Sequence, residues 1–156
     1  MIQRIQSLWF SMAALLLGAL YFLPLVSATI ASSSVRVVMK AGNVSESSDN
    51  QLLHHYSFWW INAALMVVIL FVLVLIFLYA NRKLQIQLAY VAILLTLLLC
   101  FIFSQAIRHV FKMIDLTSAN YHFAVLLPSF AVFFLILAIK AIKKDEKLIQ
   151  MADRMR

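Results

Sequence analysis

Charged side chains are almost absent from four long stretches of this chain, and several other residue types are scarce throughout it. The 156 residues include one cysteine, two glycines, two prolines and six acidic residues. A single thiol, Cys100, excludes an intrachain disulfide and the paired thiols of a dithiol redox enzyme. No Gly-x-x-x-x-Gly-Lys loop is present to bind nucleotide phosphates, and His54-His55 has no Cys, Asp or Glu at a metal-ligand spacing. The sequence therefore predicts no cofactor and no metal site.

Apolar residues dominate what remains, at 65% of the chain. Most lie in residues 8–27, 58–80, 86–107 and 121–141, where Lys140, next to the end of the last stretch, is the one charged side chain. About twenty helical residues, at about 1.5 Å each, cross a hydrocarbon core of about 30 Å. Each stretch predicts a helix because a chain in lipid must satisfy its own backbone hydrogen bonds.

These stretches predict the fold class. We expect an all-α membrane protein, a single polytopic domain over residues 1–156 in which four transmembrane helices form an antiparallel bundle. No acidic side chain lies in the four stretches to bind a cation or carry a proton at mid-depth.

The distribution of the net charge of +7 predicts the orientation. Four spans place both termini on one side of the membrane, and short basic loops stay cytoplasmic. We therefore expect cytoplasmic N and C termini, and a basic surface that meets lipid head groups instead of nucleic acid. Nine basic residues lie on the predicted inner face and four on the outer, namely Arg4, Arg82, Lys83, Lys140, Lys143, Lys144, Lys147, Arg154 and Arg156 against Arg36, Lys40, Arg108 and Lys112.

The first outer segment, residues 28–57, contains the β-branched run 35–40 followed by a Gly42-Asn43 turn. This pattern predicts a short extracytoplasmic strand, one half of a hairpin between helices 1 and 2. Its partner is either the stretch after the turn or another protein. The polar stretch 45–51 predicts a loop.

The second outer segment, residues 108–120, is amphipathic. We expect Val110, Phe111 and Ile114 to lie on lipid while Lys112 and Asp115 face water.

Polar residues within or near the spans are candidates for contacts between helices. Such groups commonly hydrogen-bond across helix pairs in a bilayer. We favour this role over a transport path for Asn62, Thr96, Ser104 and Gln105.

The cytoplasmic tail, residues 142–156, predicts an amphipathic helix that continues the fourth span. We favour contact with membrane lipid, through the charge of its lysines and the burial of its apolar side chains. A docking helix for a membrane or cytosolic protein is the alternative. The candidate contact residues are Lys143, Lys144, Lys147, Leu148, Met151 and Met155.

The two ends of the chain carry a family resemblance. Gln3–Gln6 reads Gln-Arg-Ile-Gln, residues 143–148 read Lys-Lys-Asp-Glu-Lys-Leu, and residues 152–154 read Ala-Asp-Arg. In these motifs the chain resembles an uncharacterised bacterial domain-of-unknown-function family of small four-span inner-membrane proteins. The resemblance implies a compartment and a topology, and no activity.

The expected function is that of a non-enzymatic integral inner-membrane protein. It would serve as a structural or accessory component that engages lipid or protein partners through its cytoplasmic ends. The alternative is a small transporter or channel built as a homo-oligomer, because one four-helix bundle leaves little room for a pore. In that case Asn62, Ser104 and Gln105 would line a shared cavity.

Overall fold

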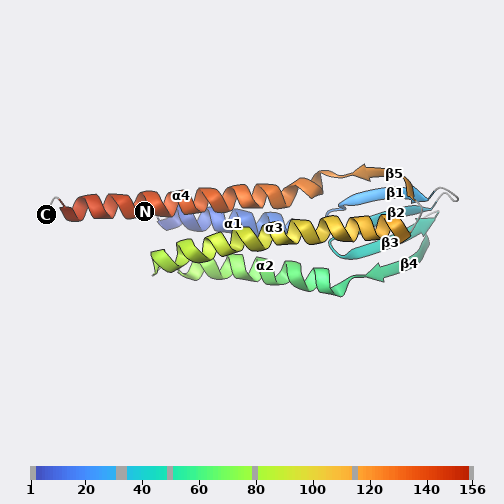
Figure 1. Ribbon diagram of the computed structural model, residues 1–156, viewed down its shortest axis with the longest axis horizontal. Helices are drawn as coiled ribbons and strands as arrows, with labels where there is room; N and C mark the ends of the chain where they lie inside the picture. The colour runs from blue at the N-terminus through green and yellow to red at the C-terminus, as the bar shows by residue number, and fades with distance from the viewer. Residues whose placement is uncertain (1–2, 31–34, 49–50, 79–80, 114–115, 155–156) are drawn as a thin grey trace.

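Four helices and one antiparallel sheet form an elongated molecule in the computed structural model, with the sheet at one end (Figure 1). The structure describes residues 3–30, 35–48, 51–78, 81–113 and 116–154. Helix α1 spans Gln3–Ala19, α2 Trp59–Phe77, α3 Arg82–Met113 and α4 Leu127–Arg154, and the 3-10 helix η2, Phe123–Leu126, precedes α4. Gln3 and the C-terminal part of α4 lie opposite the sheet (Figure 1). We call these two ends the tail end and the sheet end.

Within the described residues, three helices are long and apolar enough to cross a membrane. They cover Trp59–Phe77, Arg82–Lys112 and Phe123–Leu148, and coincide with three of the four expected spans. The apolar part of α1 covers 14 residues, Gln6–Ala19, or about 21 Å. The first apolar stretch is therefore divided: its N-terminal part is helical, and its last residues, from Val26, begin strand β1.

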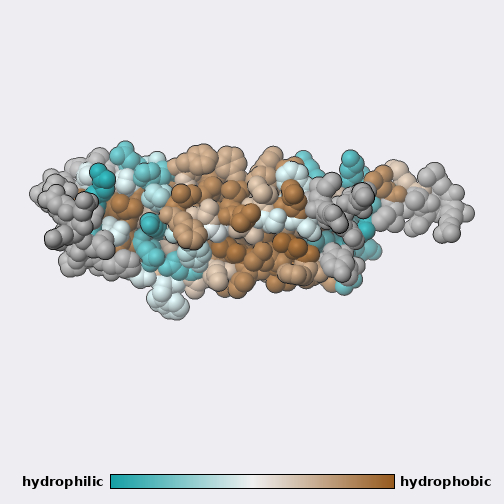
Figure 2. Space-filling view, turned by 180° about the vertical axis from the view of Figure 1, so that it is seen from behind, coloured by the Kyte–Doolittle hydropathy of each residue, from teal (hydrophilic) through white to brown (hydrophobic). Residues whose placement is uncertain are grey.

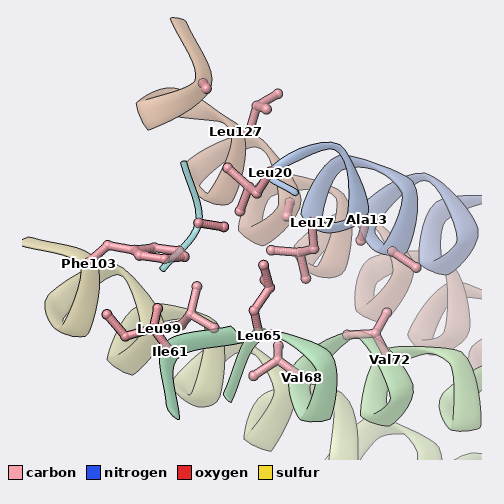
Figure 3. Packing of buried hydrophobic residues seen from close by; sticks show 14 of the residues in the cluster. Ala13, Leu17, Leu20, Ile61, Leu65, Val68, Val72, Leu99, Phe103 and Leu127 are labelled. Carbon is pink, nitrogen blue, oxygen red and sulfur yellow. The ribbon is translucent and has the colours of Figure 1, made fainter. Parts of the chain in front are cut away.

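The helices pack in a closed ring, in which α1 and α3 each contact both α2 and α4. Figure 3 shows Leu17 of α1, Leu65 and Val72 of α2 and Leu99 of α3 converging on the same interior. The outward faces are apolar as well, and on the face seen in Figure 2 a broad apolar band lies between hydrophilic side chains at both ends. An apolar surface of this extent is typical of a molecule surrounded by lipid.

The sheet has five antiparallel strands in the order β4-β3-β2-β1-β5. Strands β1 (Val26–Ile30), β2 (Arg36–Lys40), β3 (Asn43–Ser48) and β4 (Gln51–Ser57) come from the first outer segment, and β5 (Leu116–Tyr121) from the second. The expected strand is β2, and its partner is the stretch after the turn, β3.

Two local expectations about the outer segments are wrong. Of the polar stretch 45–51, expected as a loop, residues 45–48 belong to β3 and Gln51 begins β4, while residues 49–50 lie outside the described residues. In residues 108–120, expected to lie with their apolar side chains on lipid, Val110 is buried; α3 ends at Met113 and β5 follows from Leu116. Polar residues are compatible with strands here because an antiparallel sheet can expose one face to water. Ile114 and Asp115 lie outside the described residues.

Helix α3 extends as far as the edge of the sheet that is remote from the bundle. Strand β5 begins at Leu116 beside Ile30, the last residue of β1, and returns to Tyr121 beside Val26. Because β1 leads away from the bundle, Leu116 lies at the far edge and α3 must reach it. The 32 residues of α3 cover about 48 Å, which is longer than a hydrocarbon core.

The C-terminal part of α3 and one face of the sheet share a core. Val37 and Met39 of β2 are buried while their neighbours along the strand are not. Phe103 and Val110 of α3 belong to the same buried cluster. Val110, expected on lipid, is 5% exposed, so the prediction for this residue is wrong; it belongs to the buried cluster instead.

A tight turn joins the sheet to the bundle. Gly42, between β2 and β3, has φ +85°, and its carbonyl oxygen accepts a hydrogen bond of 2.7 Å from Phe58 N. A Cβ at this position would lie 3.0 Å from Phe58 O and from Asn62 Oδ1. Glycine is needed here both for the left-handed backbone and for the close approach of α2.

We predict that Gly42→Ala destabilises the protein by about 1–2 kcal/mol through the left-handed conformation alone, with a further loss from the contact with Phe58 O. Thermal unfolding in detergent, followed by circular dichroism, measures the effect. Gly18→Ala is the matched control, because Gly18 is helical and nothing lies within 4 Å of its added Cβ. It should leave stability unchanged or raise it by about 0.5 kcal/mol. Equal melting temperatures for the two variants would contradict the role of Gly42.

Candidate functional site

The two ends of the chain meet at the tail end of the bundle. The side-chain amide of Gln6 in α1 donates a hydrogen bond from Nε2 to Oδ2 of Asp145 in α4. Both side chains are buried, with 4% and 8% of their surface exposed. A carboxylate removed from water needs a hydrogen-bond donor to offset its lost hydration. Gln6 supplies it, and thereby connects the Gln-Arg-Ile-Gln segment with the Lys-Lys-Asp-Glu-Lys segment.

A second buried glutamine connects the other two helices near the same end. Gln85, in the first turn of α3, donates from Nε2 to Leu75 O near the end of α2, over 2.9 Å. Within the described part of the chain, its Oε1 and the Nη1 atom of Arg82 are buried without a hydrogen-bond partner. These atoms offer an acceptor and a donor that a bound water could satisfy.

The candidate tail residues do not share one environment. Lys143 Nζ donates to the Tyr90 hydroxyl at 2.9 Å and lies 5.4 Å from the centre of its ring. Lys143 therefore connects α4 to α3 by a hydrogen bond and a cation–π contact. Lys144 and Lys147 are exposed.

The apolar side chains of the tail also face outwards. Leu148 and Met151 are 47% and 59% exposed. The C-terminal part of α4 extends beyond the other helices (Figure 1). The helix continues to Arg154, as the amphipathic pattern predicts. Met155 lies outside the described residues.

The candidate interhelical residues lie in three different places. Asn62 donates from Nδ2 to Asn43 Oδ1 at 3.3 Å, and its carbonyl oxygen accepts a 2.8 Å hydrogen bond from the Tyr21 hydroxyl. Thr96 is buried and donates to Ala92 O, one turn earlier in its own helix. Ser104 and Gln105 are exposed on α3. Asn62 thus joins α2 to the segment that follows α1 and to the start of β3.

Sequence reasoning missed Gln6, Gln85 and Asp145 as contact residues. Their position could have identified them. Each lies close to an end of an apolar stretch, where one face of the helix still points into the bundle. Their partners are not visible from spacing: Gln6 and Asp145 are 139 residues apart.

Three apolar helices of membrane-crossing length, among the described residues, and a small antiparallel sheet at one end define a class of helical proteins with the features of membrane proteins. Within this class the chain belongs to a family described as "Domain of unknown function (DUF4293)", whose model matches residues 2–155. This confirms the resemblance to an uncharacterised family. No protein with a curated description matches the chain.

We predict that Gln6→Leu destabilises the protein by about 2 kcal/mol, because it leaves the Asp145 carboxylate buried without its donor. The double variant Gln6→Leu/Asp145→Leu should recover most of the loss, since apolar side chains replace both partners. Thermal unfolding in detergent gives both values. Gln87→Leu, at an exposed glutamine of α3, is the control and should change stability little. A double variant less stable than Gln6→Leu would contradict the pairing.

Proposed function

We propose that the protein is a non-enzymatic, four-pass protein of the bacterial inner membrane and serves there as a structural or accessory component. Its N and C termini face the cytoplasm. The exposed end of α4 contacts the membrane surface, and anionic lipid is the partner that we favour over a protein.

The observation that carries this proposal is that one face of α4 is buried against α1 while neighbouring residues of the same helix are exposed. Asp145 fixes one face of the helix to α1, while Lys144, Lys147, Leu148 and Met151 are exposed on the same turns and just beyond them. Exposed lysines next to exposed apolar side chains, at the edge of an apolar band, are suited to the boundary between head groups and hydrocarbon.

The position of α1 supports a fourth pass. Its Gln6 contacts Asp145 at the tail end, and Tyr21, just beyond the helix, contacts Asn62 at the sheet end. The turns after Ala19 lead directly into β1. The chain therefore travels from one end of the bundle to the other, although its apolar helix is short.

The alternative of an oligomeric channel receives less support. It needs Asn62, Ser104 and Gln105 to line one shared cavity, but the Asn62 side chain is bound to Asn43 at the junction with the sheet. Ser104 and Gln105 lie on the outside of α3.

The proposed orientation predicts which positions a membrane-impermeant thiol reagent reaches. On a Cys100→Ser background, Arg36→Cys in β2 should be labelled in intact cells, and Asn81→Cys, just before α3 at the tail end, only after permeabilisation. Both positions are exposed and lie outside the proposed lipid contact of α4, so lack of access reflects the side of the membrane and not burial. The physical basis is the excess of basic residues at the tail end. The reverse labelling pattern would refute the orientation.

The proposed lipid contact predicts that the tail responds to lipid charge. The full chain with Cys100→Ser and Met151→Cys, carrying an environment-sensitive fluorophore, is placed in nanodiscs of phosphatidylglycerol or phosphatidylcholine. The emission should be shifted further to the blue in phosphatidylglycerol. Lys144→Gln/Lys147→Gln should abolish that difference, as should high salt, which screens exposed charges. Leu148→Ser should release the tail even at low salt.

Lys112→Gln, at an exposed lysine near the sheet, is the control and should preserve the difference between the two lipids. Identical spectra in both lipids for the unsubstituted tail would overturn the lipid contact and favour a protein partner.

A further inference from the structure

A pocket of about 380 Å³ opens between α3 and the start of α4 at the sheet end, remote from the tail. Helix α3 contributes Phe103, Ser104 and Arg108, and the chain around the start of α4 contributes Tyr121, Val125 and Ser129. Its volume lies in the range of pockets that bind small molecules.

The pocket crosses the boundary between hydrocarbon and head groups. Its lining on α3 extends from Cys100 to Arg108, which is about 12 Å along the helix axis. Arg108 lies about 39 Å from Arg82, the first residue of α3, and so beyond a hydrocarbon core of about 30 Å. One end of the pocket is therefore at acyl-chain depth and the other is among head groups.

The lining combines apolar and polar groups. Phe103 and Val125 give apolar walls, and Ser104, Ser129 and Tyr121 add hydroxyl groups. Arg108 is exposed, and among the described residues no carboxylate belongs to the lining. A guanidinium group binds phosphate oxygens through two parallel hydrogen bonds.

We propose that this pocket binds one anionic phospholipid of the leaflet on the sheet side. Its phosphate lies on Arg108 and its acyl chain passes Phe103 toward Cys100 at the other end of the pocket. An anionic head group is favoured over a zwitterionic one because the described lining offers a cation for the phosphate but no carboxylate for a lipid ammonium group. The site is at the opposite end of the molecule from the tail. A failure of the proposed tail contact would therefore not contradict it.

The test is native mass spectrometry of the purified full chain with phosphatidylglycerol and phosphatidylcholine of the same acyl chains. The unsubstituted protein should retain phosphatidylglycerol several-fold more than phosphatidylcholine. Arg108→Gln should equalise the two, and Arg108→Lys should retain part of the preference. Lys112→Gln, which removes an exposed cation on the same helix outside the pocket, should behave like the unsubstituted protein. An unchanged preference in Arg108→Gln would overturn the proposal.

A second variant tests the apolar half of the site while Arg108 is intact. Ser104→Phe places a ring in the pocket and should reduce retention of both lipids, with an unchanged circular dichroism spectrum. Retention equal to that of the unsubstituted protein would show that the lipid binds elsewhere.

Millimolar inorganic phosphate should not displace phosphatidylglycerol, because it lacks the acyl chain. Displacement by phosphate would identify Arg108 as a site for free anions and overturn the lipid proposal.

Discussion

For apolar helices surrounded by lipid, the hydrophobic effect does not favour helix–helix contact over helix–lipid contact, because hydrocarbon tails are as apolar as the leucines that face them. Shape and a few polar contacts must therefore fix how the helices are placed. The described polar contacts between helices lie mostly at the two ends of the bundle. Gln6–Asp145 joins α1 to α4 at the tail end, and Tyr21–Asn62 joins α1 to α2 at the sheet end. Between them, packed side chains such as Leu17 and Leu65 fill the interior (Figure 3).

Helix α3 connects the helical bundle to the sheet. It begins beside the end of α2, where Gln85 reaches Leu75 O, and its far end is buried with the sheet. The same helix therefore belongs to both parts. The Gly42 turn, held against Phe58 and Asn62, adds a second attachment between the sheet and the bundle.

The sequence predicted local features well and distant pairings poorly. Three of the apolar stretches coincide with long helices, and the β-branched run before Gly42 is a strand. The pairing of β1 with β5 joins segments almost ninety residues apart, and no local pattern encodes it. The polar part of β3, residues 45–48, resembled a loop because it is ordered by backbone pairing with β2 and β4, which no apolar alternation in the sequence reveals.

In the tail part of α4, too, a local feature was predicted from the sequence and a contact with a distant segment was not. The alternation of charge and apolar residues in the tail predicted a helix, and α4 does continue to Arg154. The pattern could not predict which face is turned inwards, since that depends on Gln6 at the other end of the chain. Successive helical residues are about 100° apart, so an inward Asp145 places both Lys143 and Lys147 about 160° away, on the opposite face. The buried hydrogen bond of Asp145 lies on the same face of α4 as the buried Ala138 and Ile142, and the inward direction of this face determines where the lysines point. Lys143 contacts Tyr90 on α3, whereas Lys144 and Lys147 are exposed and face the side on which we propose the membrane surface.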